Sequence, residues 1–246
     1  VRDSAFVDQL AALRHDVIVV VAFGQILPLA ILELPPLGCV NVHASLLPRY
    51  RGAAPIHWAV INGEQETGIT TMFMDSGMDT GDMILQVSLP IGSNDTTGMV
   101  HDALKELGAE VLAQTLDLLA QGVAPRIPQD HEQATYAPRL TREIERINWN
   151  GSATAVHNLI RGLNPWPGAY CLRQGQPLKI WRSEVVNPTA VSGRPGEIID
   201  LEGDGFVIQT GLGLIKIKEV QPEARKRMHA QAFVSGYGLS VGEILA

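Results

Sequence analysis

Apolar and polar positions along the first 120 residues form patterns that predict helices and strands in turn. Helical spacing of apolar residues predicts a helix over about 4–14, and the β-branched run after it predicts a buried strand over about 17–22. Further strands are expected at about 39–43, 68–74 and 82–88. Strands separated by helical segments are typical of an α/β domain with a largely parallel sheet.

Two more helices are expected in this part of the chain. The segment AAPIHWAVING has Pro55 in its first turn and Gly63 near its end, which predicts a short helix. Thr96 or Thr97 suits the N-cap of a longer helix that ends at about Ala120. The apolar residues of this helix trace one stripe, formed by Val100, Leu104, Leu107, Val111, Leu112, Leu116 and Leu119. We therefore expect the long helix to pack one face against the sheet.

The pattern changes beyond this helix. Residues 122–140 are polar, contain proline and lack periodicity, so we expect a linker between domains at 1–121 and 141–246. The second domain begins with one short helix and continues in short strands separated by glycine turns. In the strand 214–218, two lysines alternate with two isoleucines, which indicates one exposed and one buried face. These features predict a small, OB-like β-barrel.

Charge and composition agree with two parts. The net charge is −9 over residues 1–140 and +2 over residues 141–246, in a chain of 246 residues with a hydrophobic content of 46%. Cys39 and Cys171 lie in apolar surroundings and fit neither a metal-site spacing nor a disulfide framework. We therefore expect reduced thiols and a cytoplasmic protein. No apolar run reaches the roughly 18 residues of a membrane span, so no membrane association is expected.

The chain enters a helical pattern at its first residues, and its first residue is Val1 rather than a methionine. A strand that is buried on both faces needs neighbours on both sides in the sheet. We therefore expect the sequence to be part of a longer chain, with further strands ahead of residue 1.

The stretch CVNVHASLLPRYRG, residues 39–52, places polar side chains at the carboxyl end of a predicted strand. Ligand sites of open α/β sheets form at this end of the strands. Asn41 and His43 are two residues apart and therefore point to the same face. A histidine can take up a proton near neutral pH, and an asparagine amide can donate to a developing oxyanion. The pair suits acyl transfer.

A carboxylate partner for the histidine is expected from the segment DSGMDTGD, which offers Asp75, Asp79 and Asp82 between two predicted strands. The pattern alone does not choose among these three. Asparagine, serine, aspartate and glycine are also common turn formers, so both polar segments are compatible with turns alone. No G-x-S-x-G elbow surrounds Ser45, which favours direct transfer over a covalent intermediate.

Residues 41–84, NVHASLLPRYRGAAPIHWAVINGEQETGITTMFMDSGMDTGDMI, resemble the formyltetrahydrofolate-dependent formyltransferases through their N-x-H, S-L-L-P and D-T-G-D elements. RGLNPWPGAY, residues 161–170, resembles the second domain of the members that act on tRNA. The resemblance covers nearly the whole chain. It implies a Rossmann-like catalytic domain with helices on both faces of its sheet, followed by an OB-like barrel that binds tRNA.

The resemblance also implies roles for individual residues. Asn41, His43 and Asp79 would be catalytic, because Asp79 lies 36 residues after His43, a spacing that fits the family and selects this aspartate. The formyl group would pass from 10-formyltetrahydrofolate to the amine of methionine esterified to initiator tRNA, in translation initiation. The implied folate-contacting residues are Ser45, Leu46, Leu47, Pro48, Ile26, Leu27, Met74 and Met78. No metal is expected, and the protein is expected to be a monomer.

Basic residues are the candidates for contact with the tRNA. They are Arg49, Arg51, Lys216, Lys218, Arg225, Lys226 and Arg227. The densest cluster is EARKRMHA, although a solvated face fits these lysines and arginines equally well.

Two other functions stay open at the level of the sequence. One is formylation of an amino-sugar nucleotide, in which a similar catalytic domain is also joined to a small barrel. The other is a non-catalytic module that binds folate or tRNA. The segment MDSGMDTGDM favours the tRNA reaction, and the presence of Asn41, His43 and Asp79 together favours an enzyme.

Overall fold

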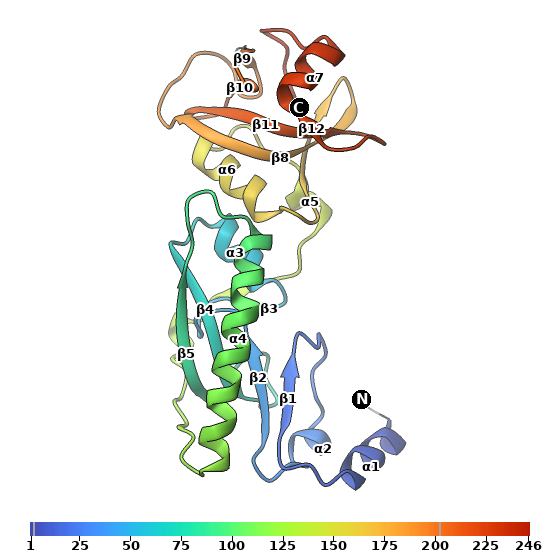
Figure 1. Ribbon diagram of the computed structural model, residues 1–246, viewed down its shortest axis with the longest axis vertical. Helices are drawn as coiled ribbons and strands as arrows, with labels where there is room; N and C mark the ends of the chain where they lie inside the picture. The colour runs from blue at the N-terminus through green and yellow to red at the C-terminus, as the bar shows by residue number, and fades with distance from the viewer. Residues whose placement is uncertain (2, 202) are drawn as a thin grey trace. The chain divides into compact units, whose positions relative to one another are not determined.

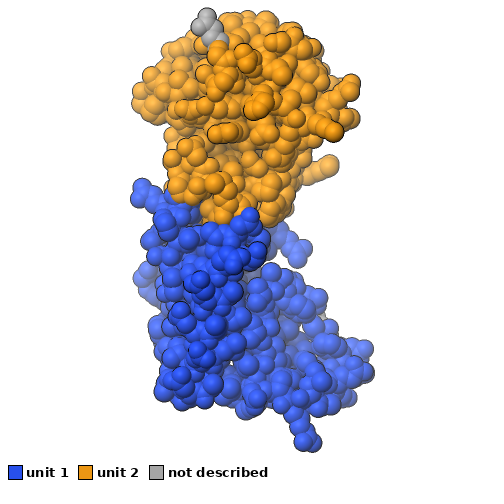
Figure 2. Space-filling model, viewed as in Figure 1, with its two compact units in different colours: residues 1–56, 65–91, 101–139 blue, residues 57–64, 92–100, 140–246 orange. Residues whose placement is uncertain are grey.

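The computed structural model describes residues 1, 3–201 and 203–246, and the chain divides into two compact units (Figure 2). The first unit consists of residues 1–56, 65–91 and 101–139, and the second of residues 57–64, 92–100 and 140–246. The boundary passes through two helices, α3 (Pro55–Ile61) and α4 (Thr97–Ala120), so each helix contributes residues to both units.

The first unit is built on a four-stranded sheet in the order β1-β2-β4-β5 (Figure 1). Its strands are β1 (Ile18–Val21), β2 (Cys39–His43), β4 (Glu66–Phe73) and β5 (Met83–Pro90). β1 and β2 are parallel, whereas β4 is antiparallel to both β2 and β5. The strands predicted from the sequence are therefore present, but the expectation of a largely parallel sheet is wrong for the described residues.

The connections explain the antiparallel pairings. Residues 74–82 join β4 to β5, and this loop is shorter than the dozen or more residues that a parallel crossover needs. Residues 44–65 join β2 to β4, and β4 runs back beside β2 in the antiparallel direction. Thr70 accordingly lies opposite His43, and Phe73 lies opposite Val40.

Helices cover both faces of this sheet, as the family resemblance implied. Leu116 and Leu119 of α4 pack on one face, against Val40 of β2 and Phe73 of β4. On the other face, α1 (Ser4–Ala12) and α2 (Leu29–Leu32) pack around Cys39. Side chains alternate along a strand, so Asn41 and His43 share the face of Cys39.

A two-stranded pair of β3 (Arg51–Gly52) and β6 (Tyr136–Ala137) completes the first unit. β6 follows the 3-10 helix η1 (His131–Gln133), and both lie in the segment expected as a linker. This segment is instead bonded into the unit, since Ile127 pairs with Met83 and the Thr135 carbonyl accepts from the amide of Arg51. Two-residue strands carry no periodicity, so the sequence pattern did not predict them.

The second unit contains an antiparallel sheet in the order β7-β8-β11-β10-β9, with β12 paired to β11 (Figure 1). Its strands are β7 (Ala169–Arg173), β8 (Gln176–Asn187), β9 (Ile198–Asp200), β10 (Phe206–Gln209), β11 (Leu214–Pro222) and β12 (Met228–His229). The amide of Leu172 donates to the Ala246 carbonyl at 2.6 Å, and the amide of Ile198 donates to the Glu243 carbonyl at 2.9 Å. The C-terminal residues therefore tie the two edge strands, β7 and β9, to each other.

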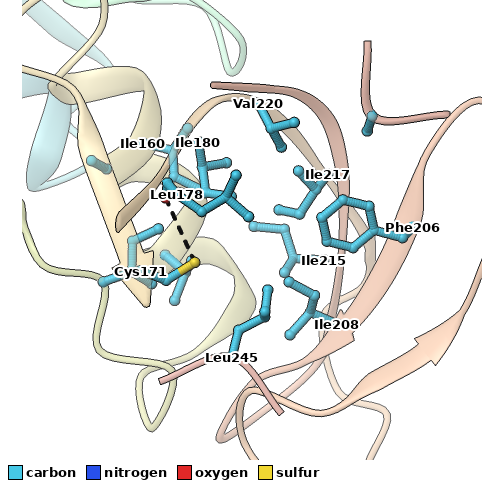
Figure 3. Close-up of a cluster of buried hydrophobic side chains, with 14 of the residues drawn as sticks. Ile160, Cys171, Leu178, Ile180, Phe206, Ile208, Ile215, Ile217, Val220 and Leu245 are labelled. Atoms are coloured by element: carbon cyan, nitrogen blue, oxygen red, sulfur yellow. Dashed lines mark hydrogen bonds between the residues drawn. The ribbon is translucent and has the colours of Figure 1, made fainter. Parts of the chain in front are cut away.

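The core of the second unit lies between the curled sheet and its helices (Figure 3). Ile215 and Ile217 of β11 are fully buried while Lys216 and Lys218 are partly exposed, as the alternation predicted. The helices are α5 (Arg142–Glu145), α6 (Ala153–Gly162) and α7 (Ala230–Tyr237). Among the described residues, no helix of either unit is long and apolar enough to cross a membrane.

Both cysteines are free and buried, one in each unit. The Cys171 thiol donates to the Leu178 carbonyl at 3.7 Å, as the dashed line in Figure 3 marks. Burial raises the pKa of Cys171 to about 12 and the pKa of Cys39 to about 11. Both therefore remain protonated thiols at neutral pH, which agrees with the expected structural role.

Candidate active site

β2 and the following β4–β5 loop bring three polar side chains together. Asn41 and His43 are 9% and 6% exposed and point to one face of β2. The Asp79 carboxylate places Oδ1 3.5 Å from Asn41 Nδ2 and Oδ2 3.8 Å from His43 Nδ1. An amide donor, an imidazole and a carboxylate thus form one group within the first unit.

The other two aspartates of the segment DSGMDTGD have different partners. Asp75 caps its own turn, since its Oδ1 accepts from the Gly77 amide at 2.9 Å and from the Thr80 hydroxyl at 2.6 Å. Asp82 pairs with Arg126 at 3.7 Å. Of the three aspartates, Asp79 therefore remains the catalytic candidate, because Asp75 forms hydrogen bonds within its own turn and Asp82 forms an ion pair with Arg126.

The loop that carries Asp79 has to fold back along the sheet to reach the histidine. Because β4 is antiparallel to β2, the loop starts beside the beginning of β2, where the Met74 amide donates to the Cys39 carbonyl at 2.8 Å. The Gly52 amide then holds Asp79 Oδ2 at 2.8 Å. Asp79 has a φ of +57°, a left-handed conformation that aspartate tolerates better than most side chains.

Close packing explains the glycine of the D-T-G-D element. A Cβ on Gly81 would lie 1.9 Å from the carbonyl oxygen of Phe73, which is far inside van der Waals contact. Any side chain at this position would push the loop away from β4 and so displace Asp79, which is two residues away. This glycine therefore supports the geometry of the site without touching it.

Gln129 is a further residue at this loop, and the sequence pattern did not predict it. Its side chain is 6% exposed, and its Nε2 donates to the carbonyls of Asp79 at 2.9 Å and Gly81 at 2.8 Å. It lies in the aperiodic segment expected as a linker, so periodicity gave no signal for its burial.

The hydrogen bonds of the histidine define which nitrogen is available for chemistry. His43 Nε2 lies 3.0 Å from the Tyr50 carbonyl, which can only accept, so this nitrogen carries a proton. In the neutral ring, Nδ1 then has the lone pair, and it faces Asp79. The arrangement lets His43 take up a proton at Nδ1 next to a carboxylate, while Asn41 offers an amide donor nearby.

The S-L-L-P segment is mostly anchored to the sheet. The Ser45 hydroxyl donates to the Arg49 carbonyl at 2.7 Å, and the Leu47 amide donates to Thr70 Oγ1 at 3.2 Å. Ser45 and Leu47 are buried, so their side chains are enclosed by protein and cannot contact a ligand in this structure. The expected folate contact is left to Leu46 and Pro48, which are half-buried.

The four folate candidates outside the S-L-L-P segment fall into two pairs. Leu27 is buried and packs in one cluster with Met74, which is half-buried. Ile26 and Met78 are exposed, at 55% and 49%. The loop with Ile26 follows β1, which is parallel to β2, so it leaves the sheet at the edge where Asn41 and His43 lie.

The basic residues divide into buried, paired and exposed ones. Arg51 is 2% exposed and binds Gln129 with its guanidinium, so burial rules it out as a direct phosphate contact in this structure. Lys216 lies 3.0 Å from Asp204, and Lys218 pairs with both Glu184 and Asp204. These bonds lower the pKa of Asp204 and raise that of Lys218.

Four arginines and lysines of the predicted set keep exposed side chains. They are Arg49, Arg225, Lys226 and Arg227. The Arg227 guanidinium stacks over the ring of Trp181 at 3.5 Å from its centroid. Within the part of the chain that the structure describes, no group of three or more His, Cys, Asp or Glu residues is placed to hold a metal ion.

Comparison with known proteins identifies the family of this site. The profile described as formyl transferase matches residues 1–116, and that described as formyl transferase, C-terminal domain, matches residues 139–238. Methionyl-tRNA formyltransferase of Desulforamulus reducens is 51% identical over 245 residues, which cover 100% of this chain and 77% of that protein. The chain belongs to the formyl transferase family. Methionyl-tRNA formyltransferase of Moorella thermoacetica is 53% identical over 99% of this chain and 78% of that protein.

Solved structures share the fold at lower identity. HypX from Aquifex aeolicus, crystallised with tetrahydrofolic acid, is 18% identical with a TM-score of 0.70, over 96% of this chain and 41% of that one. WlaRD, a sugar 3N-formyl transferase, is 22% identical with a TM-score of 0.69, over 88% of this chain and 77% of that one. The fold of this chain is therefore shared by proteins that are only 18% and 22% identical to it.

Proposed function

We propose that this protein transfers the formyl group of 10-formyltetrahydrofolate to the amino group of methionyl initiator tRNA, as a step of translation initiation. The observation that carries the proposal is the meeting of Asn41, His43 and Asp79 at one end of β2. The choice of acceptor is supported by two relatives named methionyl-tRNA formyltransferase, which are 51% and 53% identical over at least 99% of the chain.

The proposed reaction replaces one carbon–nitrogen bond with another. The amine of the methionyl group attacks the formyl carbon, and the carbonyl electron pair moves to oxygen, where the Asn41 amide stabilises the charge. The neutral imidazole of His43 takes up the amine proton at Nδ1, the nitrogen that faces Asp79, and the imidazolium that forms also stabilises the oxyanion. The carbonyl then re-forms as the bond to the folate nitrogen breaks, and His43 passes its proton to that nitrogen to give tetrahydrofolate. Proton transfer of this type typically contributes ~10²–10⁴-fold to the rate.

The apolar side chains of the first unit fit a folate. Ile26 and Met78 are exposed and suit the flat face of a pterin ring, while Leu27 and Met74 belong to the Cys39 cluster. Leu46 and Pro48 complete the proposed set, because the other two residues of S-L-L-P are enclosed by protein. Aromatic rings of a ligand are commonly held by apolar side chains with a few fixed polar groups, which is the composition proposed here.

Recognition of the tRNA is proposed to rest on exposed basic residues. In the second unit these are Arg225, Lys226 and Arg227, and in the first unit Arg49. Lysine and arginine side chains at the surface can reach the phosphates of a nucleic acid and release their counterions. We also infer that the curled antiparallel sheet of the second unit, whose edge strands are joined by the C-terminal residues, is OB-like. Folds of this kind often bind nucleic acid, which agrees with the proposed tRNA contact.

The test compares two formyl acceptors with the same protein. Purified protein and 10-formyltetrahydrofolate are offered either methionyl initiator tRNA or an amino-sugar nucleotide, and the formylated product is measured. We expect turnover with the tRNA, and none with the sugar. Turnover with the sugar alone would replace the proposed acceptor, and turnover with neither, while folate still binds, would favour a binding module.

A matched pair of variants tests the site itself. His43→Ala removes the proposed proton acceptor and is expected to lose at least ~10²-fold in kcat. His101→Ala serves as the control, because His101 is an exposed histidine of α4. Equal activity of the two variants would refute the assignment of His43.

A further inference from the structure

We propose that Gln129 and Arg51 form a positioning clamp that fixes the Asp79 carboxylate against His43. The inference rests on the proposed function, since it assigns supporting residues to the same site. Neither residue is expected to touch the substrates. The clamp would act through the backbone of the loop that carries Asp79.

Gln129 uses both ends of its amide. Its Nε2 donates to the carbonyls of Asp79 and Gly81 at 2.9 and 2.8 Å, on either side of the residue between them. Its Oε1 accepts from Nε and from one terminal nitrogen of Arg51, at 3.1 and 2.6 Å. A buried amide with four partners has only one orientation that satisfies them all.

Arg51 connects this amide to the rest of the site through its own backbone. Its neighbour Gly52 donates to the Asp79 carboxylate at 2.8 Å, and its other neighbour Tyr50 accepts from His43 at 3.0 Å. Three consecutive residues therefore hold the imidazole, the carboxylate and, through the Arg51 side chain, the clamp. The relative position of His43 and Asp79 depends on this short segment.

The conformation of Asp79 explains why such a clamp is needed. A φ of +57° is disfavoured for a residue with a side chain, so the loop does not hold this shape by local preference alone. The two hydrogen bonds from Gln129 fix the carbonyl of Asp79 itself and that of Gly81. The surrounding structure thus determines a backbone conformation that the sequence of the loop would not select.

The decisive variant is Gln129→Glu. Glutamate keeps an oxygen for Arg51, but it replaces the donating nitrogen with an oxygen that faces two carbonyls. We expect kcat for methionyl-tRNA to fall by ~10–100-fold, because a small displacement of a catalytic group has an effect of this order. KM should stay within about threefold of the wild type, because the clamp contacts neither substrate. Gln121→Glu is the control, since it makes the same charge change at an exposed glutamine.

A second readout is independent of activity. The amide of Gly52 is bound to the Asp79 carboxylate, so its proton signal in NMR reports directly on the position of Asp79. The sequence contains two Arg-Gly pairs, 51–52 and 161–162, so labelled arginine carbonyl and glycine nitrogen leave two amide signals. The Asp79→Ala variant identifies the signal of Gly52 and gives its position without the hydrogen bond.

The outcomes separate the clamp from the proposed function. In Gln129→Glu, the Gly52 signal should move toward its position in Asp79→Ala, together with the loss in kcat. A normal kcat, or a reduced kcat with an unmoved Gly52 signal, would overturn the clamp. If the wild type formylates no tRNA, the proposed function fails, and the Gly52 signal still decides whether Gln129 positions Asp79.

A milder variant covers the case in which Gln129→Glu does not fold. Arg51→Lys keeps the charge but cannot form both hydrogen bonds that the guanidinium donates to Gln129 Oε1. We expect a smaller loss in kcat and a smaller shift of the Gly52 signal than in Gln129→Glu. The KM values for methionyl-tRNA and for 10-formyltetrahydrofolate should both stay unchanged. Wild-type kcat together with an unmoved Gly52 signal in this variant would count against the clamp.

Discussion

Asp79→Asn separates the charge of this residue from its backbone conformation. Asparagine has nearly the same shape as aspartate and is also tolerant of a positive φ, so the loop should keep its conformation at φ +57°. One side-chain oxygen remains to accept from the Gly52 amide. The variant therefore removes the negative charge beside His43, together with the oxygen that accepts from Asn41 Nδ2 at 3.5 Å.

The distance between the two groups gives the size of the effect. Asp79 Oδ2 lies 3.8 Å from His43 Nδ1, and both side chains are mostly buried. With an effective dielectric constant of about 20, the attraction between a carboxylate and an imidazolium at this distance is about 4 kcal/mol. The amide dipole of asparagine recovers part of it. A tenfold change in rate corresponds to ~1.4 kcal/mol, so we expect kcat to fall by ~10²–10³-fold.

The assay is single-turnover formylation of methionyl-tRNA, with binding of each substrate measured separately. The loss should lie in the chemical step, because the imidazolium forms only as the amine proton is transferred. Asp75→Asn is the matched control, since it makes the same change in the same loop and keeps the oxygen that accepts from Gly77. A kcat for Asp79→Asn within about threefold of that of this control would refute the role of the charge.

Three further predictions concern the second unit. Burial, with a smaller contribution from the charge of Arg161, lowers the pKa of His157, so acidification below about pH 6.5 protonates the unfolded chain first and should lower Tm. His157→Gln should reduce this slope, and an unchanged slope would contradict the reasoning. Leu245 is 1% exposed, so Leu245→Ala should lower the free energy of unfolding in urea by about 2–5 kcal/mol; a near-zero change would show that the C-terminal residues do not seal the core. Lys226→Glu should raise the KM for tRNA and reduce by about one the slope of log affinity against log salt concentration. Lys218→Glu should change KM less, because the Lys218 amine already forms ion pairs. Equal effects of the two variants would argue against a tRNA contact at the exposed cluster of Arg225, Lys226 and Arg227.

The elements of the fold were largely predictable because they carry clear periodicity. The long stripe of α4 and the alternation of Ile215 and Ile217 with lysines were read correctly from the sequence. The direction of β4 was not, since a strand buried on both faces has the same residue pattern in parallel and antiparallel sheets. For β5, the nine-residue connection 74–82 was a usable signal that a parallel crossover was excluded.

The candidate site was predictable where its residues are close in sequence. Asn41 and His43 follow from their spacing on one strand, because residues two apart share a face. Asp79 needed the resemblance to a family, since three aspartates in one loop are equivalent in pattern. The burial of Arg51 was not foreseen, because an arginine in a polar loop is exposed by default, and its contacts with Gln129 and His131 make burial tolerable.

The antiparallel direction of β4 and the role of Gln129 are connected. In a parallel arrangement, the loop after β4 would emerge beside the end of β2, and a short loop would place an aspartate next to His43 directly. Here the loop emerges beside Cys39 and returns along the sheet, and Asp79 within it is left-handed. Residues 75–81 of this loop form no strand, so hydrogen bonds from a distant part of the chain hold its conformation. The segment with Gln129 does so, which explains why a stretch without periodicity is bonded into the first unit.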